Sequence, residues 1–544
     1  MNRTQIIKRL REETFDVCII GGGASGAGAA LDAALRGMKV ALIEADDFAS
    51  GTSSRSTKLI HGGVRYLEQA FKQLDFAQLK QVKHGLEERH IVLSNAPHLA
   101  RPLALITPVF NRWEGWYYAL GLKLYALFAS KRDTLPGSRW LSRKAAWRHI
   151  PTLTRRMYGA VLYYDGQLDD ARYALALAQS AGTQGAAVIN HTVLTGFEVS
   201  DTGRIEKAWL KNQLIPDEPA IALRAKVFLN CTGPGADKIR LMANPNALRR
   251  IRQSKGVHAV LPSSVLNSTD ALLIPKTPDG RVVFAVPFQD KLLLGTTDDE
   301  YVTPDQEPVL ERKEVEYLLN TLRPYLDTPV HADLVEAGFG GLRPLIQSVG
   351  KATKGLLRDH EVELDEVSGL ISLMGGKWTT YRLMAKDAVD AVAKRLGNAQ
   401  PCQTDDFLLD GAMVYSEAIL KAWERQSGLD EQMIRHLYHN YGKNVPKVLA
   451  LLAADASLGE RLADGYPFIK AEVCYAAEEE MCCSVRDFVA RRIRLEIGSW
   501  PAAEKAAPEV ARLLGKTLHW SKEKIEAESD QYQQLMQFFM RQIR

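Results

Sequence analysis

The sequence predicts an α/β protein built from three parts, and three observations lead to this fold class. A strand, a glycine-rich turn, a helix and a second strand follow one another over residues 15–44. Between residues 254 and 300, short strands come without intervening helices, which is typical of an antiparallel sheet. From about Gln403 onward, apolar residues recur at helical spacing. We therefore expect a parallel-sheet domain, an antiparallel-sheet domain and a C-terminal all-helical domain.

The first part contains a nucleotide-binding motif. Gly21, Gly23 and Gly26 form G-x-G-x-x-G between the strand and the helix. Such glycines permit a tight turn, close approach to a pyrophosphate and close packing of helix on strand. Glu44 ends the second strand, where an acid would accept hydrogen bonds from ribose hydroxyls, and it argues against a 2'-phosphate. A motif at the start of a long chain is more typical of proteins that hold FAD in a buried site than of enzymes that bind NAD reversibly.

Two later segments are consistent with the same site. Residues 45–63 are rich in Ser, Thr and Gly and would either wrap a polar ligand or form a solvated loop. The apolar strand 227–231 ends in a glycine-rich turn at Gly233, which would return to the same sheet and reach the cofactor again.

Helical segments are expected between these strands. Residues 72–95 and 311–326 have helical periodicity, and Asp169 opens a helix that Gly182 is placed to end.

Length and composition limit the class of protein. The 544 residues are too many for one core, and the 46% hydrophobic and 25% charged fractions are those of a soluble globular protein. The net charge of +4 does not suggest a nucleic-acid partner. The six cysteines contain no C-x-x-C pair and the chain has no calcium-binding loop motif, so we predict no metal site and reduced thiols on the cytoplasmic side. We see no signal peptide and no apolar membrane span.

Residues 101–164 have a distinct character. Aromatic and aliphatic side chains crowd residues 113–128, and residues 134–164 contain several Arg and Lys but no Asp or Glu. This pattern fits a surface that rests on anionic lipid headgroups. It fits equally an interior helix beside a solvated basic face.

Several sequence strings together resemble the FAD-dependent glycerol-3-phosphate dehydrogenase family. They are Thr52-Ser53-Ser54, Ser56-Thr57-Lys58-Leu59-Ile60-His61-Gly62-Gly63-Val64-Arg65-Tyr66-Leu67-Glu68, Lys255-Gly256-Val257-His258, Gly295-Thr296-Thr297-Asp298, Gly341-Leu342-Arg343-Pro344-Leu345 and Gly375-Gly376-Lys377-Trp378-Thr379-Thr380-Tyr381-Arg382. The resemblance covers about residues 14–395 and extends more loosely into the helical tail.

The resemblance implies a Rossmann-like FAD-binding domain of the glutathione-reductase and D-amino-acid-oxidase type. We assign residues 14–100, 165–253 and 346–400 to this discontinuous domain, 101–164 and 254–345 to a substrate or cap domain, and 403–544 to the helical domain.

The implied activity is oxidation of sn-glycerol 3-phosphate to dihydroxyacetone phosphate, with electrons passing from FAD to ubiquinone or menaquinone. The implied location is cytoplasmic, on the inner face of the cell membrane, and a homodimer is an option that the sequence leaves open.

A substrate dianion requires fixed cations, and a hydride transfer requires a base for the hydroxyl proton. The substrate-binding candidates are Arg65, Tyr66, Arg343, Arg358 and Lys377. His258, Arg343 and Lys377 are the catalytic candidates, although His258 could equally orient the flavin. The cofactor-binding candidates are Gly21, Gly23, Ser25, Gly26, Glu44, Thr52, Ser53, Ser54, Thr57, Lys58, His61, Gly62, Gly233, Thr297, Gly376 and Thr379.

Other functions remain as alternatives. An oxidase of the same fold would pass electrons to dioxygen, and an amine or amino-acid oxidase would need a single carboxylate-binding Arg rather than several cations. A flavin-binding module without turnover would not need the Gly-Gly-Lys and Gly-Leu-Arg-Pro strings. An NAD-linked dehydrogenase is disfavoured because one good dinucleotide fingerprint is visible.

Overall fold

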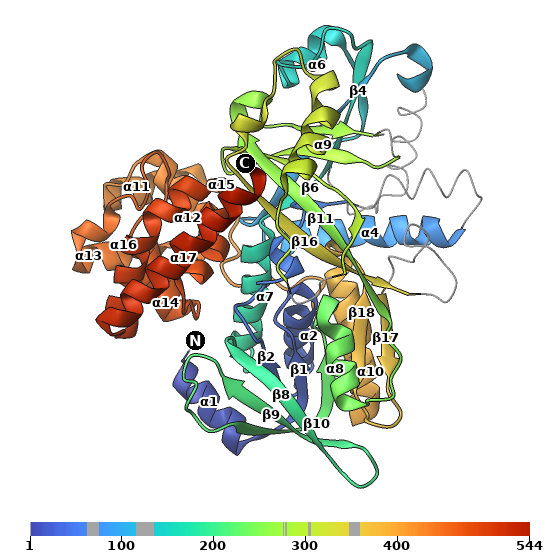
Figure 1. The fold of residues 1–544 in the computed structure, drawn as a ribbon, viewed down its shortest axis with the longest axis vertical. Coiled ribbons are helices and arrows are strands. Elements are labelled where there is room, and N and C mark those ends of the chain that lie inside the picture. Colours follow the sequence, from blue (N-terminus) through green and yellow to red (C-terminus); the bar gives the residue numbers. More distant parts are fainter. Residues whose placement is uncertain are drawn as a thin grey trace.

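The described residues form two β-sheets and a group of C-terminal helices in a computed structural model of the protein (Figure 1). The structure describes residues 2–61, 76–115, 135–275, 277, 280–302, 306–347 and 360–544. The predicted α/β fold with an antiparallel second sheet and a helical C-terminal region is confirmed.

The first sheet contains the glycine motif. Within the described residues it has eight strands in the order β17-β18-β10-β1-β2-β7, with the β8–β9 hairpin attached through β10. Strands β18, β10, β1, β2 and β7 are mutually parallel, so their carboxyl ends lie at one edge. The strands are β1 (Thr14–Ile20), β2 (Val40–Ile43), β7 (Ala187–Ile189), β8 (Thr192–Val199), β9 (Ile205–Asn212), β10 (Ile221–Asn230), β17 (His360–Leu364) and β18 (Ile371–Gly375).

Helices cover this sheet because its central strands are apolar on both faces. All four residues of β2 are buried, as are the last four of β1. The covering helices are α1 (Arg3–Glu12), α2 (Ala24–Leu35), α4 (Phe76–Asn95), α7 (Asp170–Thr183), α8 (Ala236–Ala243) and α10 (Tyr381–Leu396).

The second sheet is largely antiparallel. Its ten strands in the described part follow the order β15-β11-β14-β13-β12-β4-β6-β3, with β16 beside β11 and β5 beside β6. They are β3 (Leu59–Ile60), β4 (Ala100–Val109), β5 (Arg139–Ser142), β6 (Gly159–Leu168), β11 (Ile251–Pro262), β12 (Ala271–Ile274), β13 (Val283–Phe288), β14 (Lys291–Gly295), β15 (Asp299–Glu300) and β16 (Ala337–Ile346). Helices α6 (Arg143–His149) and α9 (Arg312–Leu322) pack on one face.

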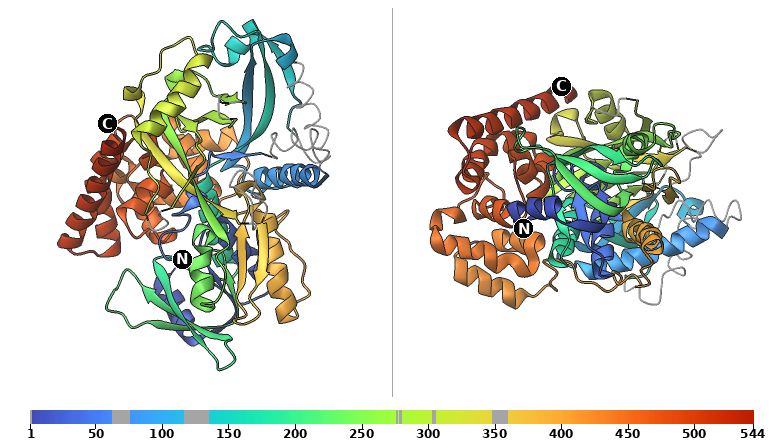
Figure 2. Two further views of the ribbon diagram at one scale, coloured as in Figure 1. Left: turned by 45° about the vertical axis from the view of Figure 1, so that its right-hand side comes forward. Right: turned by 90° about the horizontal axis from the view of Figure 1, so that it is seen from below.

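The C-terminal helices share a hydrophobic core with the other face of this second sheet. Figure 2 shows them grouped on one side of the two sheets. They are α11 (Glu417–Ser427), α12 (Glu431–Tyr441), α13 (Val445–Ala454), α14 (Ala471–Glu479), α15 (Leu495–Gly498), α16 (Trp500–Leu518) and α17 (Lys522–Ile543), with a π-helical turn at Asp487–Arg492. Among the described helices, none combines the length and the apolar character that crossing a membrane would require.

Candidate cofactor and substrate site

A cavity of about 1350 Å³ lies where the carboxyl ends of the parallel strands meet the second sheet. Its walls include the segments that follow β1, β2, β10, β14 and β18 and residues of β11, β13 and β16. Ligands bind at the carboxyl ends of strands in open α/β sheets, and typical small-ligand pockets measure roughly 300–1,000 Å³. The cavity is therefore large enough for a dinucleotide together with a small substrate.

The glycine motif follows β1 and opens α2. Gly21 has φ +109°, and a Cβ there would meet the Cys231 carbonyl oxygen at 2.7 Å. A Cβ at Gly26 would meet the Gly21 carbonyl oxygen at 1.9 Å, so Gly26 allows α2 to pack on β1 and does not itself line the cavity. Gly23 and Ser25 line the cavity at the N-terminus of α2, where a positive helix end favours phosphate.

Glu44 follows β2 at the same edge of the sheet and lines the cavity. Its carboxylate accepts hydrogen bonds from the backbone N–H groups of Gly22 at 2.6 Å and Asp46 at 2.9 Å. Burial raises the pKa of Glu44 to about 7, although these two bonds oppose the shift.

The Ser/Thr-rich loop after β2 connects the two sheets. The Thr52 hydroxyl donates to the Leu342 carbonyl at 2.6 Å, and the Ser53 hydroxyl accepts from the Ala24 N–H at the start of α2 at 2.9 Å. Thr52, Ser53, Thr57 and His61 all line the cavity. The loop therefore lies against both the N-terminus of α2 and the second sheet.

Two residues of this loop, Ser54 and Lys58, were predicted as cofactor contacts but do not line the cavity. The Lys58 ammonium is fully buried and bonds to Asp170 and to the Ser54 carbonyl, each at 2.8 Å. Burial lowers the pKa of Lys58 to about 8 despite the neighbouring carboxylate. Some side chains of this loop face the cavity and others face the C-terminal helices. Ser54 and Lys58 lie on the side of the C-terminal helices.

His258 lies near the middle of β11, between Gly295 of β14 and Phe339 of β16. Its ring stacks on Phe339 with centroids 4.7 Å apart, and its Nε2 is 3.0 Å from the Thr57 hydroxyl. Nδ1 is enclosed and has no hydrogen-bond partner among the described residues. A Cβ at Gly295 would meet the imidazole at 2.2 Å, so this position must be glycine for the ring to fit.

The surroundings of His258 favour the neutral form of its imidazole. Burial, with the Lys58 ammonium and the Arg343 guanidinium nearby, lowers the pKa of His258 well below its ordinary value. A neutral imidazole at the cavity wall can accept a proton.

Two cationic candidates line the cavity from different parts of the chain. Arg343 of β16 donates to Thr296 at 3.1 Å and to the Thr297 carbonyl at 3.0 Å, and pairs with Asp298 at 3.2 Å. A Cβ at Gly256 would meet the Arg343 guanidinium at 2.4 Å, which explains the glycine two residues before His258. Lys377 follows the glycine pair after β18 and also faces the cavity.

The remaining predicted residues fall into two groups. Four line the cavity: Gly233, Thr297, Gly376 and Thr379. The other four lie outside the described residues: Gly62, Arg65, Tyr66 and Arg358.

Sequence reasoning missed some residues that shape the site. The Trp378 indole donates to the Ser53 carbonyl at 2.9 Å, and the Arg55 guanidinium donates to the Gly340 carbonyl at 3.2 Å. Both residues lie within or beside the quoted strings, which was the available signal. Asp170, whose carboxylate holds Ser56 and Lys58, stands over a hundred positions away in sequence and gave none.

Comparisons with known proteins were made for the whole chain. A family model described as FAD dependent oxidoreductase matches residues 16–389, and one described as the C-terminal domain of alpha-glycerophosphate oxidase matches residues 402–525. A mitochondrial glycerol-3-phosphate dehydrogenase of Arabidopsis thaliana is 40% identical, with 98% of this chain and 88% of the relative covered. The mitochondrial enzyme of Homo sapiens is 39% identical, with 95% and 72% covered.

Solved structures give a similar result. The crystal structure of glycerol-3-phosphate dehydrogenase from Bacillus halodurans complexed with FAD has a TM-score of 0.80 and 29% identity, and the match covers 99% of this chain and 97% of that one. The L-alpha-glycerophosphate oxidase of Mycoplasma pneumoniae, at 17% identity and a TM-score of 0.55 over 72% of this chain and 97% of that one, shares the fold.

Proposed function

Because the chain belongs to the FAD-dependent oxidoreductase family, in its glycerol-3-phosphate dehydrogenase branch, we propose that it oxidises sn-glycerol 3-phosphate to dihydroxyacetone phosphate. Its cofactor is FAD. The observation that best supports the substrate is that one cavity is lined by Gly21 and Gly23 of the glycine motif, by His258 and by the cations Arg343 and Lys377.

The residues present fit FAD. The absence of a side chain at Gly23 leaves space between the start of α2 and Ser53. A Cβ there would lie 2.8 Å from the Ser53 hydroxyl oxygen and would fill the space that the phosphates approach. Gly21, Gly23, Ser25, Ser53 and the N-terminus of α2 would hold the pyrophosphate, and Glu44 the ribose hydroxyls. Thr52, Thr57, His61, Gly233, Thr297, Gly376 and Thr379 would line the remainder of the cofactor.

The reaction divides between cofactor and protein. FAD, when bound, would supply the acceptor for the hydride that leaves C2 of the substrate. The hydroxyl proton of C2 goes to Nε2 of His258, which shares the cavity wall with Thr57, and the C2–O bond becomes a carbonyl. Arg343 and Lys377 bind the phosphate, and its negative charge offsets the effect of the Arg343 guanidinium on the pKa of His258.

The acceptor that reoxidises the flavin would be a membrane quinone, either ubiquinone or menaquinone. Several aromatic side chains are exposed at the end of the second sheet that lies away from the parallel sheet, and they support a membrane surface as partner. Trp113 is 85% exposed, Tyr158 46%, Trp140 43% and Phe110 40%. The exposed cations beside them are Arg112, Arg139, Arg143, Lys144, Arg148, Arg155 and Arg156. We infer that this end rests on anionic headgroups at the inner face of the cell membrane.

Dioxygen is the second candidate acceptor. The match of residues 402–525 to the C-terminal domain of alpha-glycerophosphate oxidase favours it. The acceptor is independent of the substrate, so a single experiment addresses both questions.

The test is anaerobic reduction of the purified holoprotein with glycerol 3-phosphate, followed by reoxidation with a soluble quinone or with air. Bleaching of the flavin, fast reoxidation by quinone and slow reoxidation by air would support the dehydrogenase. Fast reoxidation by air with hydrogen peroxide formation would make the protein an oxidase. A flavin-loaded protein that does not bleach would refute the proposed substrate.

A further inference from the structure

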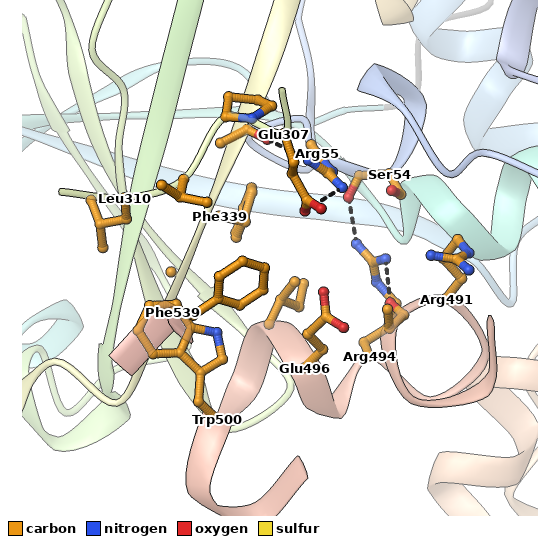
Figure 3. Close-up of a pocket in the computed structure, with 16 residues that line it drawn as sticks. Ser54, Arg55, Glu307, Leu310, Phe339, Arg491, Arg494, Glu496, Trp500 and Phe539 are labelled. Carbon is orange, nitrogen blue, oxygen red and sulfur yellow. Dashed lines mark hydrogen bonds and ion pairs between the residues drawn. The ribbon is translucent and has the colours of Figure 1, made fainter. Parts of the chain in front are cut away.

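A buried arginine of the C-terminal domain donates a hydrogen bond to the Ser/Thr-rich loop that follows β2. Arg494 follows the π-helical turn, has φ +67° and is 1% exposed. One of its Nη atoms donates to the Ala490 carbonyl at 2.9 Å and thereby fixes the guanidinium to its own domain. The other donates to the Ser54 carbonyl at 2.8 Å and to Asp170 at 2.9 Å. Figure 3 shows Arg494 beside Ser54 and Arg55 at this junction.

Asp170, in the first turn of α7, holds the same loop from a second direction. Its Oδ2 accepts from the Ser56 N–H at 2.9 Å, from the Ser56 hydroxyl at 2.7 Å and from the Lys58 ammonium at 2.8 Å. The Lys58 ammonium also reaches the Ser54 carbonyl. Asp170, Lys58 and Arg494 are each at most 1% exposed, so water does not screen these charges.

The opposite side of the loop forms the cavity wall. Ser53 bonds to the first N–H of α2, and Thr57 bonds to His258. The Lys58 ammonium lies 4.7 Å from the centre of the Phe339 ring, on which His258 stacks. Residues 53–58 thus alternate between cofactor-side contacts and the buried Asp170 cluster, and a shift at one side moves the other.

We propose that Arg494 is a positioning residue for the flavin site: it fixes residues 53–58 against α2 and His258, and so makes the C-terminal helical domain part of the FAD-binding apparatus. The inference rests on FAD binding by this family and not on the identity of the substrate. The contrary interpretation is that Arg494 only docks the helical domain, as other buried arginines at the interface do.

Arg172 provides a matched control. It is 4% exposed, and it bonds across the same interface to Glu480, twice at 2.8 Å, and to the Asn440 carbonyl at 2.8 Å. Its guanidinium bonds to Glu480 and Asn440 and not to residues 53–58. Arg172→Met therefore weakens the docking of the domain without removing a support of the loop.

The experiment compares wild type, Arg494→Met, Arg494→Lys and Arg172→Met as full-length proteins. FAD is removed, the dissociation constant is measured by flavin fluorescence, and the visible circular dichroism of the reloaded flavin is recorded beside the melting temperature. We expect Arg494→Met to weaken FAD binding by tenfold or more and to alter the flavin dichroism. Arg494→Lys keeps a cation near Asp170, so we expect this variant to fold and its FAD affinity to fall severalfold.

We expect Arg172→Met to lower the melting temperature while its FAD affinity stays within about twofold of wild type. Equal FAD affinity and dichroism in Arg494→Lys and wild type, or equal losses in Arg172→Met and Arg494→Met, would overturn the inference. If Arg494→Met does not fold, the lysine variant and the control still decide the matter. A wild-type protein that binds no FAD would instead overturn the assigned cofactor, so the two failures are distinguishable.

Discussion

At the scale of single residues, His258 is the side chain on which the proposed chemistry depends. Burial lowers its pKa, it lines the cavity, and its Nε2 lies 3.0 Å from the Thr57 hydroxyl. We predict that His258→Asn retains FAD but bleaches with glycerol 3-phosphate about 10²- to 10⁴-fold more slowly, the usual loss on removing a general base. Stopped-flow bleaching under anaerobic conditions measures this rate. His149→Asn, a histidine paired with Asp270 away from the cavity, should bleach at the wild-type rate.

Arg343 tests the identity of the group that the cations bind. Hydrogen bonds to charged groups contribute about 1.5–3 kcal/mol, so we expect Arg343→Gln to lower kcat/KM for glycerol 3-phosphate by roughly 10- to 150-fold. The much slower oxidation of glycerol, which has no phosphate, should change little. Arg252→Gln, on the neighbouring strand and paired with Glu300, is the control. An equal loss with both substrates would show that Arg343 does not act through the phosphate.

The raised pKa of Glu44 leads us to predict that cofactor binding depends on pH. Ribose hydroxyls donate to the ionised carboxylate, so binding FAD favours the deprotonated form and lowers the pKa of Glu44 from its value of about 7. FAD affinity should therefore rise as pH increases through 7 and level off above it. The difference between a charged and a neutral hydrogen bond is about 1 kcal/mol, or roughly fivefold. Fluorescence titration of the apoprotein at pH 6 and pH 8 measures it, and Glu44→Gln should show no such difference.

Only part of the site could be predicted at this scale. The glycines at 21, 23 and 26 follow from a motif whose spacing is fixed by the geometry of strand, turn and helix. The orientation of Ser54 and Lys58 could not be predicted, because a loop has no period that assigns its side chains to one side. Their partners, Asp170 and Arg494, are brought to them by the packing of distant segments.

At the scale of elements, the contact between β1 and α2 sets the position of the turn that we propose binds the pyrophosphate. A Cβ at Gly26 would lie 1.9 Å from the Gly21 carbonyl, so Gly26→Ala must push the helix away from the strand. We predict a destabilisation of about 1–3 kcal/mol, typical of overpacking, and loss of FAD during purification. Gly196→Ala, at a glycine with nothing within 4 Å of its added Cβ, should be close to neutral. Melting temperature and the flavin-to-protein absorbance ratio measure both effects.

The boundaries of elements were less predictable than their type. Asp169 caps α7 as expected, with its side chain accepting from two backbone N–H groups, but the helix runs through Gly182 to Thr183. Gly185, at φ +91°, follows the helix instead. Likewise the pair Leu59–Ile60, within the segment assigned to the first domain, forms β3 and pairs with β6 in the second sheet. Local composition does not indicate when a connecting segment crosses to another sheet.

At the scale of the whole molecule, the C-terminal helices are not separate from the catalytic region. Their core continues into one face of the second sheet, including Phe339, on which His258 stacks. The ion pairs that join the helices to the first domain link residues about three hundred or more positions apart, such as Asp170 with Arg494. Helical periodicity predicted that these helices exist, but long-range pairing of buried charges has no signature in a single sequence.

The whole molecule also has a definite polarity, since α6 and the end of β4 lie far from the parallel sheet (Figure 1). Exposed aromatic residues and cations meet at this end, and each cation near an anionic membrane contributes about 1 kcal/mol of binding free energy. We predict that the combined change Arg143→Gln, Lys144→Gln and Arg148→Gln on α6 weakens binding to vesicles containing anionic lipid by about 100-fold. Flavin bleaching by substrate should be unchanged, because none of the three lines the cavity.

Co-sedimentation with phosphatidylglycerol vesicles at low and high salt measures this binding. The control changes three exposed cations of the C-terminal helices, Lys505, Lys516 and Lys522, to Gln, which alters the net charge equally. If both triple variants lose binding equally, the attraction comes from net charge and not from a defined membrane-facing end. If only the α6 variant loses binding and added salt removes the difference, the end of the molecule that carries α6 binds the membrane through its cations. The reduced flavin would then pass its electrons on in a protein already bound at the headgroups, where a lipid-soluble quinone is available.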